Sequence, residues 1–300
     1  MAGNRPGLLL GAGAYGMWGL FPAFFPLLKP AGAVEILAHR IVWSLILLAV
    51  VIVLVGRLGE LRTMSRRTWL LLTCASALIA ANWAIYVYAV NNGHVVDAAL
   101  GYFINPLVTV ALGVLIFRER LNRAQLVALA ITVVAVVVLT MEIGSLPYIG
   151  LGLALSFALY GAVKKTVDVD PRISVGVEAG LAAPFAVGYL LMLQSAGAGT
   201  FLGHGATHVA LLMCSGALTA IPLLLFAAAA QRLPMVTMGL LFYLTPVMQM
   251  SWGVLVGHEA MPPARWLGFA LIWVALAVFS VDAVLRTRSA RRSLASEGNV

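Results

Sequence analysis

Long apolar runs separated by short polar stretches form the dominant pattern along this chain. Each run is continuous, without the alternation of polar and apolar positions that marks a strand in a membrane barrel. A helix needs about 20 mostly apolar residues to cross a bilayer core of about 30 Å. The pattern therefore predicts an all-α polytopic membrane protein with ten transmembrane helices, near 7–28, 34–55, 69–90, 97–117, 124–141, 148–164, 174–194, 208–230, 235–257 and 265–284.

The composition agrees with a membrane protein. Of 300 residues, 62% are hydrophobic and 10% are charged, whereas soluble domains carry roughly 45–50% apolar and about 25% charged residues. These values exclude a soluble enzyme and a disordered chain. The net charge of +8 does not indicate a nucleic-acid partner, because the basic residues are scattered through the gaps between apolar runs. The two cysteines match no metal-ligand spacing, so we expect neither a metal nor a cofactor.

The basic residues also predict the orientation of the chain. If ten helices alternate across the bilayer, all but three of the 19 Lys and Arg fall on one side, the exceptions being Lys29, Arg40 and Arg265. Loops on the cytoplasmic side are enriched in Lys and Arg. We therefore expect both termini in the cytoplasm, with residues 285–300 as a basic cytoplasmic tail.

The sequence contains an internal repeat. When it is shifted by 140 residues it matches itself without gaps over a long stretch, so that Pro106, for example, meets Pro246. We predict two five-helix repeats, over residues 1–142 and 143–284. Because five is an odd number, the second repeat is inverted relative to the first. Transporters built in this way place the substrate site near the bilayer midplane, between the repeats.

Polar residues recur at matched depths in the two repeats. The fourth helix presents Tyr102, Asn105 and Thr109 on one face, and Thr245 and Gln249 take the positions of the last two in the ninth helix. In each helix a proline removes one backbone donor nearby. This repetition favours two helices that bend around a cavity over ordinary kinks satisfied by neighbouring helices. With a polar face of the third helix added, the predicted solute contacts are Asn82, Tyr86, Tyr102, Asn105, Thr245 and Gln249.

Titratable residues inside the predicted spans are few. A charged group at the bilayer centre costs about 2.5–3.5 kcal/mol on insertion scales, so it needs a reason to be there. Glu35 and His39 share one face at the outer end of the second helix, beside Arg40, and Glu178 lies near the cytoplasmic end of the seventh. Glu35, His39 and Glu178 are therefore candidate proton carriers. The alternative is an interfacial acid favoured by the helix dipole and paired with a base.

Several segments resemble the RarD family, a branch of the EamA-type drug/metabolite transporter superfamily. The most specific are Glu35-Ile-Leu-Ala-His-Arg40, Asn82-Trp83 leading to Ala89-Val-Asn-Asn92, and Leu100-Gly-Tyr-Phe-Ile-Asn-Pro-Leu107, with Gly144-Ser-Leu-Pro147 and Ile272-Trp-Val-Ala-Leu-Ala277 in support. The resemblance implies ten helices in two EamA repeats, a location in the bacterial inner membrane, and a transporter named for its association with chloramphenicol sensitivity.

The chain departs from the superfamily pattern at the end of the fourth helix of each repeat. Superfamily members often have Gly-Glu there, where this chain has Arg118-Glu119 and His258-Glu259. The two glutamates could act as gates or as helix caps, and capping is favoured. We expect the missing glycine to affect helix termination more than chemistry.

The first functional hypothesis is a secondary active transporter that moves a small organic solute, a metabolite or drug, across the bilayer by alternating access with proton coupling. An uncoupled facilitator is one alternative. A membrane-embedded enzyme acting on a lipid carrier is another, but it would need clustered acids or a nucleophile with its base, and the acids here are single and on opposite sides. We therefore do not expect an enzyme. The pattern defines no oligomeric state.

Overall fold

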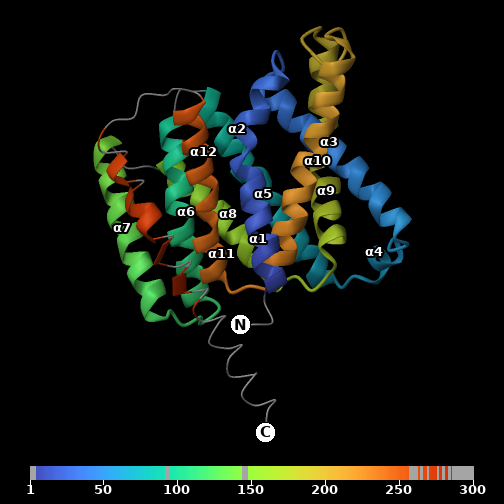
Figure 1. Cartoon of the computed structure of the whole chain (residues 1–300). Helices are drawn as coiled ribbons and strands as arrows, with labels where there is room; N and C mark the ends of the chain where they lie inside the picture. Colours follow the sequence, from blue (N-terminus) through green and yellow to red (C-terminus); the bar gives the residue numbers. More distant parts are fainter. Residues whose placement is uncertain are drawn as a thin grey trace.

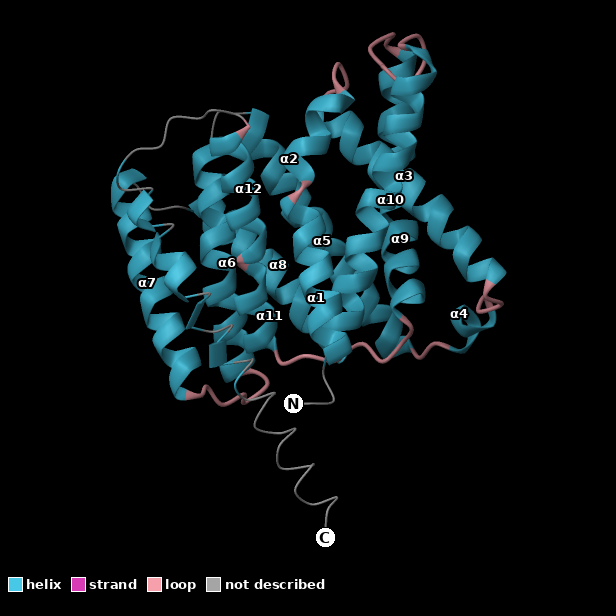
Figure 2. Cartoon of the chain, in the orientation of Figure 1, coloured by secondary structure: helices cyan, strands magenta, loops and turns pink. Residues whose placement is uncertain are grey.

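The described part of the chain is helical. The computed structural model describes residues 5–91, 95–143, 148–256 and parts of 263–285, and these form helices joined by loops, with no strand among them (Figure 2). Residues 286–300 of the expected basic tail, as well as Asn92, Gly144–Pro147, Glu259 and Arg265, lie outside the described residues.

A helix covers each of the first nine predicted segments. The elements are α1 (Arg5–Gly19), α2 (Phe21–Phe24), the 3₁₀ turn η2 (Phe25–Leu28), α3 (Ala33–Leu54), α4 (Gly59–Thr63), α5 (Arg66–Asn91), α6 (Val95–Leu115), α7 (Arg123–Ile143), α8 (Tyr148–Thr166), α9 (Pro171–Ser195), α10 (Gly205–Ala230), α11 (Met235–Phe242) and α12 (Leu244–Leu255). The helices lie side by side in one bundle, with α7 at its left edge and α4 at its lower right (Figure 1).

The two matched prolines act differently. Pro246 follows a break at Tyr243, which divides the ninth predicted segment into α11 and α12, as expected when a proline ring crowds the carbonyl four residues earlier. Pro106, by contrast, lies inside the continuous helix α6. The first predicted segment is also divided, because Pro22 and Pro26 each begin a new short turn after α1 ends.

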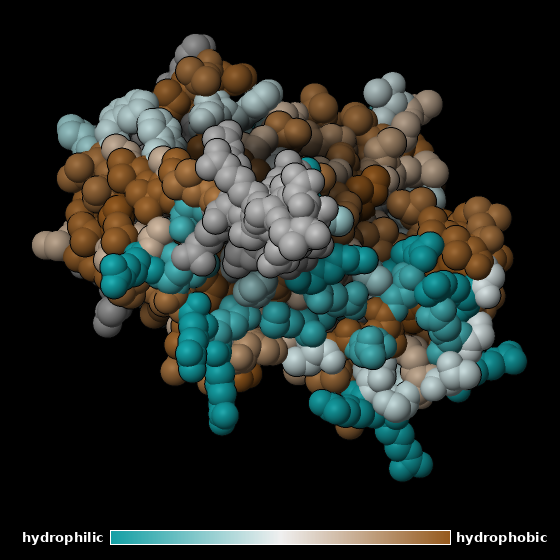
Figure 3. Space-filling model, turned by 60° about the horizontal axis from the view of Figure 1, so that its bottom comes forward, coloured by the Kyte–Doolittle hydropathy of each residue, from teal (hydrophilic) through white to brown (hydrophobic). Residues whose placement is uncertain are grey.

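The sides of the bundle are apolar. Within the residues that the structure describes, five segments are long and apolar enough to cross a membrane, namely Arg5–Leu28, Ala33–Leu54, Arg66–Tyr86, Pro171–Ser195 and Gly205–Ala230. Large side chains on their outer surfaces are open to the surroundings, and Phe185 is 82% exposed. Hydrophilic side chains gather on the face at the bottom of Figure 1, while the flanks are hydrophobic (Figure 3). Such a surface suits a multi-pass membrane protein surrounded by lipid.

The N-terminal half of the chain, which ends with α7, and the C-terminal half, which begins with α8, pack closely against one another. The most extensive helix pairings are α6 with α8, α3 with α9 and α10, α1 with α10, and α5 with α8. Each of these pairs takes one helix from each half. The interior of the bundle is therefore an interface between the halves.

Helices α3 and α10 approach at their backbones. A Cβ added to Gly216 would lie 2.4 Å from the Cβ of Trp43 and 2.7 Å from the backbone nitrogen of Ser44. Ser44 Oγ donates a hydrogen bond to the carbonyl oxygen of Gly216 at 2.9 Å. Small residues at helix interfaces allow this approach in membranes, where tight packing replaces the hydrophobic effect as the driving force.

The substitution Gly216→Ala tests this contact. Because the added methyl group meets backbone atoms, α3 and α10 must separate, and overpacking of this kind costs about 1–3 kcal/mol. We expect a lower apparent melting temperature for the detergent-purified protein, measured by tryptophan fluorescence. Gly188→Ala is the matched control, because a Cβ at Gly188 in α9 has no atom within 4 Å. Equal melting temperatures for the two variants would contradict the contact.

Candidate functional site

A cavity of about 530 Å³ lies between the two halves of the chain. Its volume is within the roughly 300–1,000 Å³ of small-molecule sites. Its walls carry the aromatic side chains of Trp18, Phe21, Phe25, Trp83, Phe157 and Phe242. All six predicted solute contacts also line it: Asn82, Tyr86, Tyr102, Asn105, Thr245 and Gln249. The structure therefore brings together residues from α5, α6 and α12 that are up to 167 positions apart, from Asn82 to Gln249.

Two of the cavity amides also fasten α8. Asn82 Nδ2 donates to the carbonyl oxygen of Leu153 at 2.9 Å and to Ser156 Oγ at 3.0 Å. Asn105 Nδ2 donates to the carbonyl oxygen of Ala154 at 3.0 Å. These bonds hold α5 and α6 against the middle of α8, so both amides have a structural role beside any contact with a solute.

Helix α12 is fastened to α1 in the same way. Thr245 Oγ1 donates to the carbonyl oxygen of Tyr15 at 2.8 Å, and Gln249 Nε2 donates to that of Trp18 at 3.1 Å. Side chains of α12 thus donate to backbone carbonyl oxygens of α1, just as a side chain of α6 donates to a backbone carbonyl oxygen of α8. Among the cavity candidates, the hydroxyl groups of Tyr86 and Tyr102 have no hydrogen-bond partner in the described part of the chain.

Arg40 also lines the cavity, a placement that the sequence did not reveal. Its Nε donates to Thr219 Oγ1 of α10 at 2.7 Å. The guanidinium carbon lies over the rings of Phe21, Phe25 and Trp83, at 5.3, 5.4 and 5.6 Å from their centroids. The sequence signal that could have indicated this placement is that Arg40 lies inside an apolar run and away from the predicted cytoplasmic side.

The structure places Glu35 and His39 beneath the loop between α9 and α10, and neither lines the cavity. Glu35 Oε1 accepts a hydrogen bond from the backbone nitrogen of Thr200 at 2.6 Å. The ring of His39 stacks on Phe201, with centroids 4.7 Å apart. Both side chains are buried, and neither ring nitrogen of His39 has a hydrogen-bond partner among the described residues.

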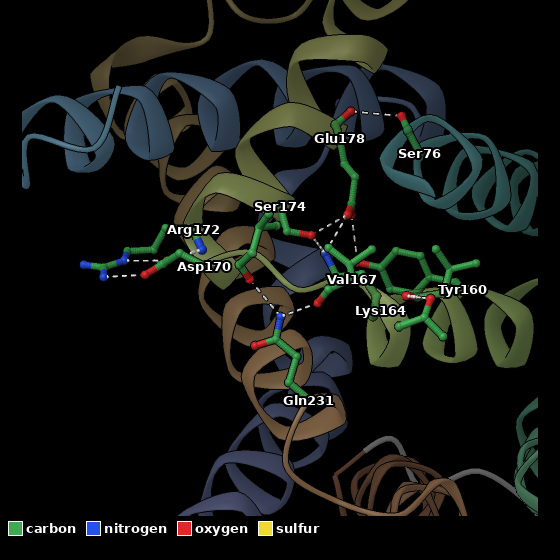
Figure 4. A network of polar contacts seen from close by, with 12 residues as sticks. Ser76, Tyr160, Lys164, Val167, Asp170, Arg172, Ser174, Glu178 and Gln231 are labelled. Atoms are coloured by element: carbon green, nitrogen blue, oxygen red, sulfur yellow. Dashed lines mark hydrogen bonds and ion pairs between the residues drawn. The ribbon is translucent and has the colours of Figure 1, made fainter. Parts of the chain in front are cut away.

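Glu178 lies in a buried polar network (Figure 4). Its Oε1 is 2.5 Å from Lys164 Nζ and accepts from Ser174 Oγ at 3.1 Å. Tyr160 OH donates to its Oε2 at 3.0 Å, and Lys164 Nζ also donates to Ser174 Oγ. The Lys164 and Glu178 side chains are 1% and 4% exposed. The network therefore gives each of the two charges a partner within the chain.

Sequence reasoning missed Lys164 as the partner of Glu178. It grouped Lys164 with the basic residues that set orientation, because the lysine stands at the end of a predicted span and is followed by Lys165. The last turn of α8 instead turns Lys164 inward, while Lys165 reaches Glu119 at 3.6 Å. A spacing of 14 residues across a loop gives no periodic signal that could have identified the pair.

The loop between α8 and α9 is held by contacts with Arg57, before α4, and with Gln231, after α10. Asp170 caps α9 by accepting from the backbone nitrogen of Arg172 at 2.8 Å, and its other oxygen is 2.9 Å from Arg57 Nη1. Hydrogen bonds from the Arg172 side chain lower the pKa of the Asp170 carboxyl. Gln231 Nε2 donates to the carbonyl oxygens of Val167 and Val169 (Figure 4). These contacts fix the end of the bundle next to the Glu178 network.

Glu119 caps a helix of the other half. Its two carboxylate oxygens accept from the backbone nitrogens of Met235 and Val236, the first residues of α11, at 2.8 and 2.9 Å. This agrees with the capping role favoured from the sequence. Arg118 before it has φ of 53°, in the left-handed region that favours glycine. A glycine at position 118 would relieve this backbone strain.

Comparison with known proteins gives close relatives over nearly the whole chain. The pattern of the EamA-like transporter family matches residues 5–141. The chain is 51% identical to "Protein RarD" of Streptomyces exfoliatus, covering 97% of this chain and 92% of that protein. It is 40% identical to "Uncharacterized transporter YojE" of Bacillus subtilis (strain 168), covering 97% and 98%, and 37% identical to "Protein RarD" of Escherichia coli (strain K12), covering 95% and 97%.

A solved crystal structure of a protein has the same overall fold. It superposes with a TM-score of 0.70 at 16% sequence identity, covering 91% of this chain and 97% of the other. Among the described residues, no group of three or more His, Cys, Asp or Glu side chains is placed to hold a metal ion.

A double-mutant cycle tests whether Lys164 and Glu178 form a coupled buried pair. Removing one partner leaves the other charge buried and unpaired, which costs about 3–5 kcal/mol. We expect Lys164→Met and Glu178→Gln each to lower the apparent melting temperature strongly, and the double variant to lower it by much less than their sum. Lys165→Met, at the partly exposed neighbouring lysine, is the control and should have a small effect. Strictly additive losses would show that the two side chains act independently.

Proposed function

The chain belongs to the RarD family of EamA-type transporters, and we propose that it is a secondary transporter that carries a small organic solute across the bacterial inner membrane. The observation that carries this proposal is the cavity of about 530 Å³ that residues of both halves enclose. In this proposal Asn82, Tyr86, Tyr102, Asn105, Thr245 and Gln249 contact the solute.

The proposed architecture is ten transmembrane helices in two inverted repeats, over residues 1–142 and 143–284, with both termini in the cytoplasm and a basic tail over 285–300. The pattern of helix pairing supports it. If α1 corresponds to α8 and α5 to α10, then the pair α1–α10 becomes the pair α8–α5 when the halves are exchanged, and both are extensive. The pairs α3–α9 and α6–α11 likewise map onto themselves.

The distribution of polar surface supports the proposed orientation. Glu119 follows α6, Lys165 lies in the last turn of α8 and Gln231 follows α10, and polar contacts join these three helix ends. Hydrophilic side chains gather over one face of the bundle (Figure 3). Basic residues favour the cytoplasmic side, so this face is proposed to lie in the cytoplasm. Alternating access then consists of a rocking of the two halves around the cavity.

Proton coupling is the finer part of the proposal, with Glu35, His39 and Glu178 as candidate carriers. Glu178 is separated from Glu35 by most of the length of α9, because Glu35 contacts Thr200 beyond the end of that helix. A proton on Glu178 would leave the Lys164 ammonium without its counter-charge, so protonation there would favour a rearrangement of the network. An uncoupled facilitator would need no such group.

A membrane-embedded enzyme acting on a lipid carrier is the second candidate function. The relatives are named as transporters, and the separation of Glu35 from Glu178 does not provide the paired carboxylates that such chemistry would use. The transport proposal therefore fits the arrangement of acids better.

Proteoliposomes that contain only this protein test the proposal. With a pH-sensitive dye inside and an imposed pH gradient, the vesicles are challenged with amino acids, small metabolites and chloramphenicol. We expect at least one compound to collapse the gradient only when the protein is present. Labelled solute is followed in the same vesicles, so that uptake without proton movement would identify a facilitator. No protein-dependent uptake of any compound would contradict transport.

Variants then separate coupling from solute binding. Glu35→Gln is expected to abolish proton-driven accumulation of the solute while solute exchange between the two sides continues. The control is Glu60→Gln, because Glu60 is a partly exposed residue of α4 that forms an ion pair with Arg57 and does not line the cavity. If Glu35→Gln still accumulates the solute at the native level, Glu35 is not the proton carrier.

A further inference from the structure

Arg40 places a positive charge in the wall of the cavity, and the described part of the chain places no counter-charge beside it. It lies on the second turn of α3, inside a segment long and apolar enough to cross the membrane. A charge at this depth is costly unless something compensates it. None of the acidic side chains in the described part of the chain lies within ion-pair distance of Arg40. Lys164, in contrast, has Glu178.

The two acids that are buried in the described part of the chain, Glu35 and Glu178, are already engaged. Glu35 accepts from the Thr200 backbone beneath the loop that follows α9. Glu178 is held by Lys164, Ser174 and Tyr160. The positive charge of Arg40 therefore faces the cavity without an acidic partner among the described residues.

The contacts of Arg40 leave part of its guanidinium group free. Its Nε donates to Thr219 Oγ1, and this is its hydrogen bond within the described residues. The rings of Phe21, Phe25 and Trp83 surround the guanidinium carbon and stabilise the cation without using its N–H groups. The two terminal nitrogens, which form the edge that binds carboxylates in a bidentate manner, retain their donors.

The same contacts fix the position of the group. Arginine loses less side-chain freedom per hydrogen bond than lysine because its planar fork is rigid, and here Thr219 and three aromatic rings hold it. A binding group that is held before its ligand arrives loses less entropy on binding. The remaining walls are largely aromatic, and the hydroxyl groups of Tyr86 and Tyr102 are nearby in the same cavity.

We propose that the cavity binds a small organic acid, with its carboxylate on the terminal nitrogens of Arg40 and its flat apolar body against the aromatic walls. This inference rests on the proposed function, since it names the substrate class of the same cavity. It makes Arg40 the residue that distinguishes anions from neutral and cationic analogues. The transported solute then supplies the negative charge that none of the described residues places beside Arg40.

Three probes with one phenyl body test the inference: phenylacetate, phenylacetamide and phenethylamine. Their binding to the full-length protein is measured by quenching of its tryptophan fluorescence, because Trp18 and Trp83 line the cavity. Nanodiscs of phosphatidylcholine keep anionic lipid headgroups out of the assay. We expect phenylacetate to bind about tenfold or more tightly than the amide, and the amine to bind most weakly.

The variants locate this preference. Arg40→Gln should bind the acid and the amide equally, and Arg40→Lys, which keeps the charge without the fork, should retain part of the preference. Arg67→Gln is the control, because Arg67 is exposed near the start of α5 and remote from the lining residues. Equal binding of acid and amide by the native protein, no binding of the acid, or an unchanged preference in Arg40→Gln would overturn the inference.

Flux of the same probes separates this inference from the proposed function. Arg40-dependent binding of phenylacetate without protein-dependent uptake into vesicles would support the anion site and count against transport. Protein-dependent uptake of the amide and amine, with no advantage for the acid, would support transport and overturn the anion site.

Discussion

A bilayer offers no water to a buried polar group, so such groups in this protein are stabilised by partners within the chain. Many of these partners lie across the interface between the N-terminal and C-terminal halves. The bonds that cross this interface include those that join Arg40 to Thr219, Ser44 to Gly216, Ser76 to Glu178, Asn82 to Leu153, Asn105 to Ala154, Glu119 to Met235, and Thr245 to Tyr15. The fold and the cavity both depend on this interface, because the cavity is the part of it that side chains do not fill.

The charged groups inside the bundle are arranged at separate levels. Glu35 lies beneath the loop that follows α9, and Lys164 and Glu178 form a closed pair near the start of α9. Arg40 alone among these charged residues lines the cavity. In the account proposed here, the solute meets a fixed positive charge in the cavity, while the acids that could exchange protons lie away from it. Coupling would then act through movement of the helices.

Local patterns predicted most of the fold, whereas contacts between distant helices could not be predicted. Apolar run length identified the helices, and Pro246 indicated the break before α12. The same signal at Pro106 was followed by no break, since α6 continues through this proline, and the bond that ties the neighbouring Asn105 to α8 is one that no local pattern reveals. Among the six polar cavity residues, Asn105, Thr245 and Gln249 were identified by polar positions that repeat at matched depths, and Tyr102 by the face it shares with Asn105. Asn82 and Tyr86 were identified by the face that they share in the third predicted helix. The inward turn of Lys164 was not, since its direction is set by packing against α9.

Alternating access requires that the cavity opens in turn to the two sides of the membrane. It is tested by placing one cysteine at Leu223, in the cavity wall, after replacing the exposed Cys74 and Cys214 by alanine. Membrane-impermeant maleimide is applied from either side to oriented vesicles, with and without a transported solute. We expect labelling from both sides, with proportions that the solute changes. Labelling from one side only, under every condition, would contradict alternating access.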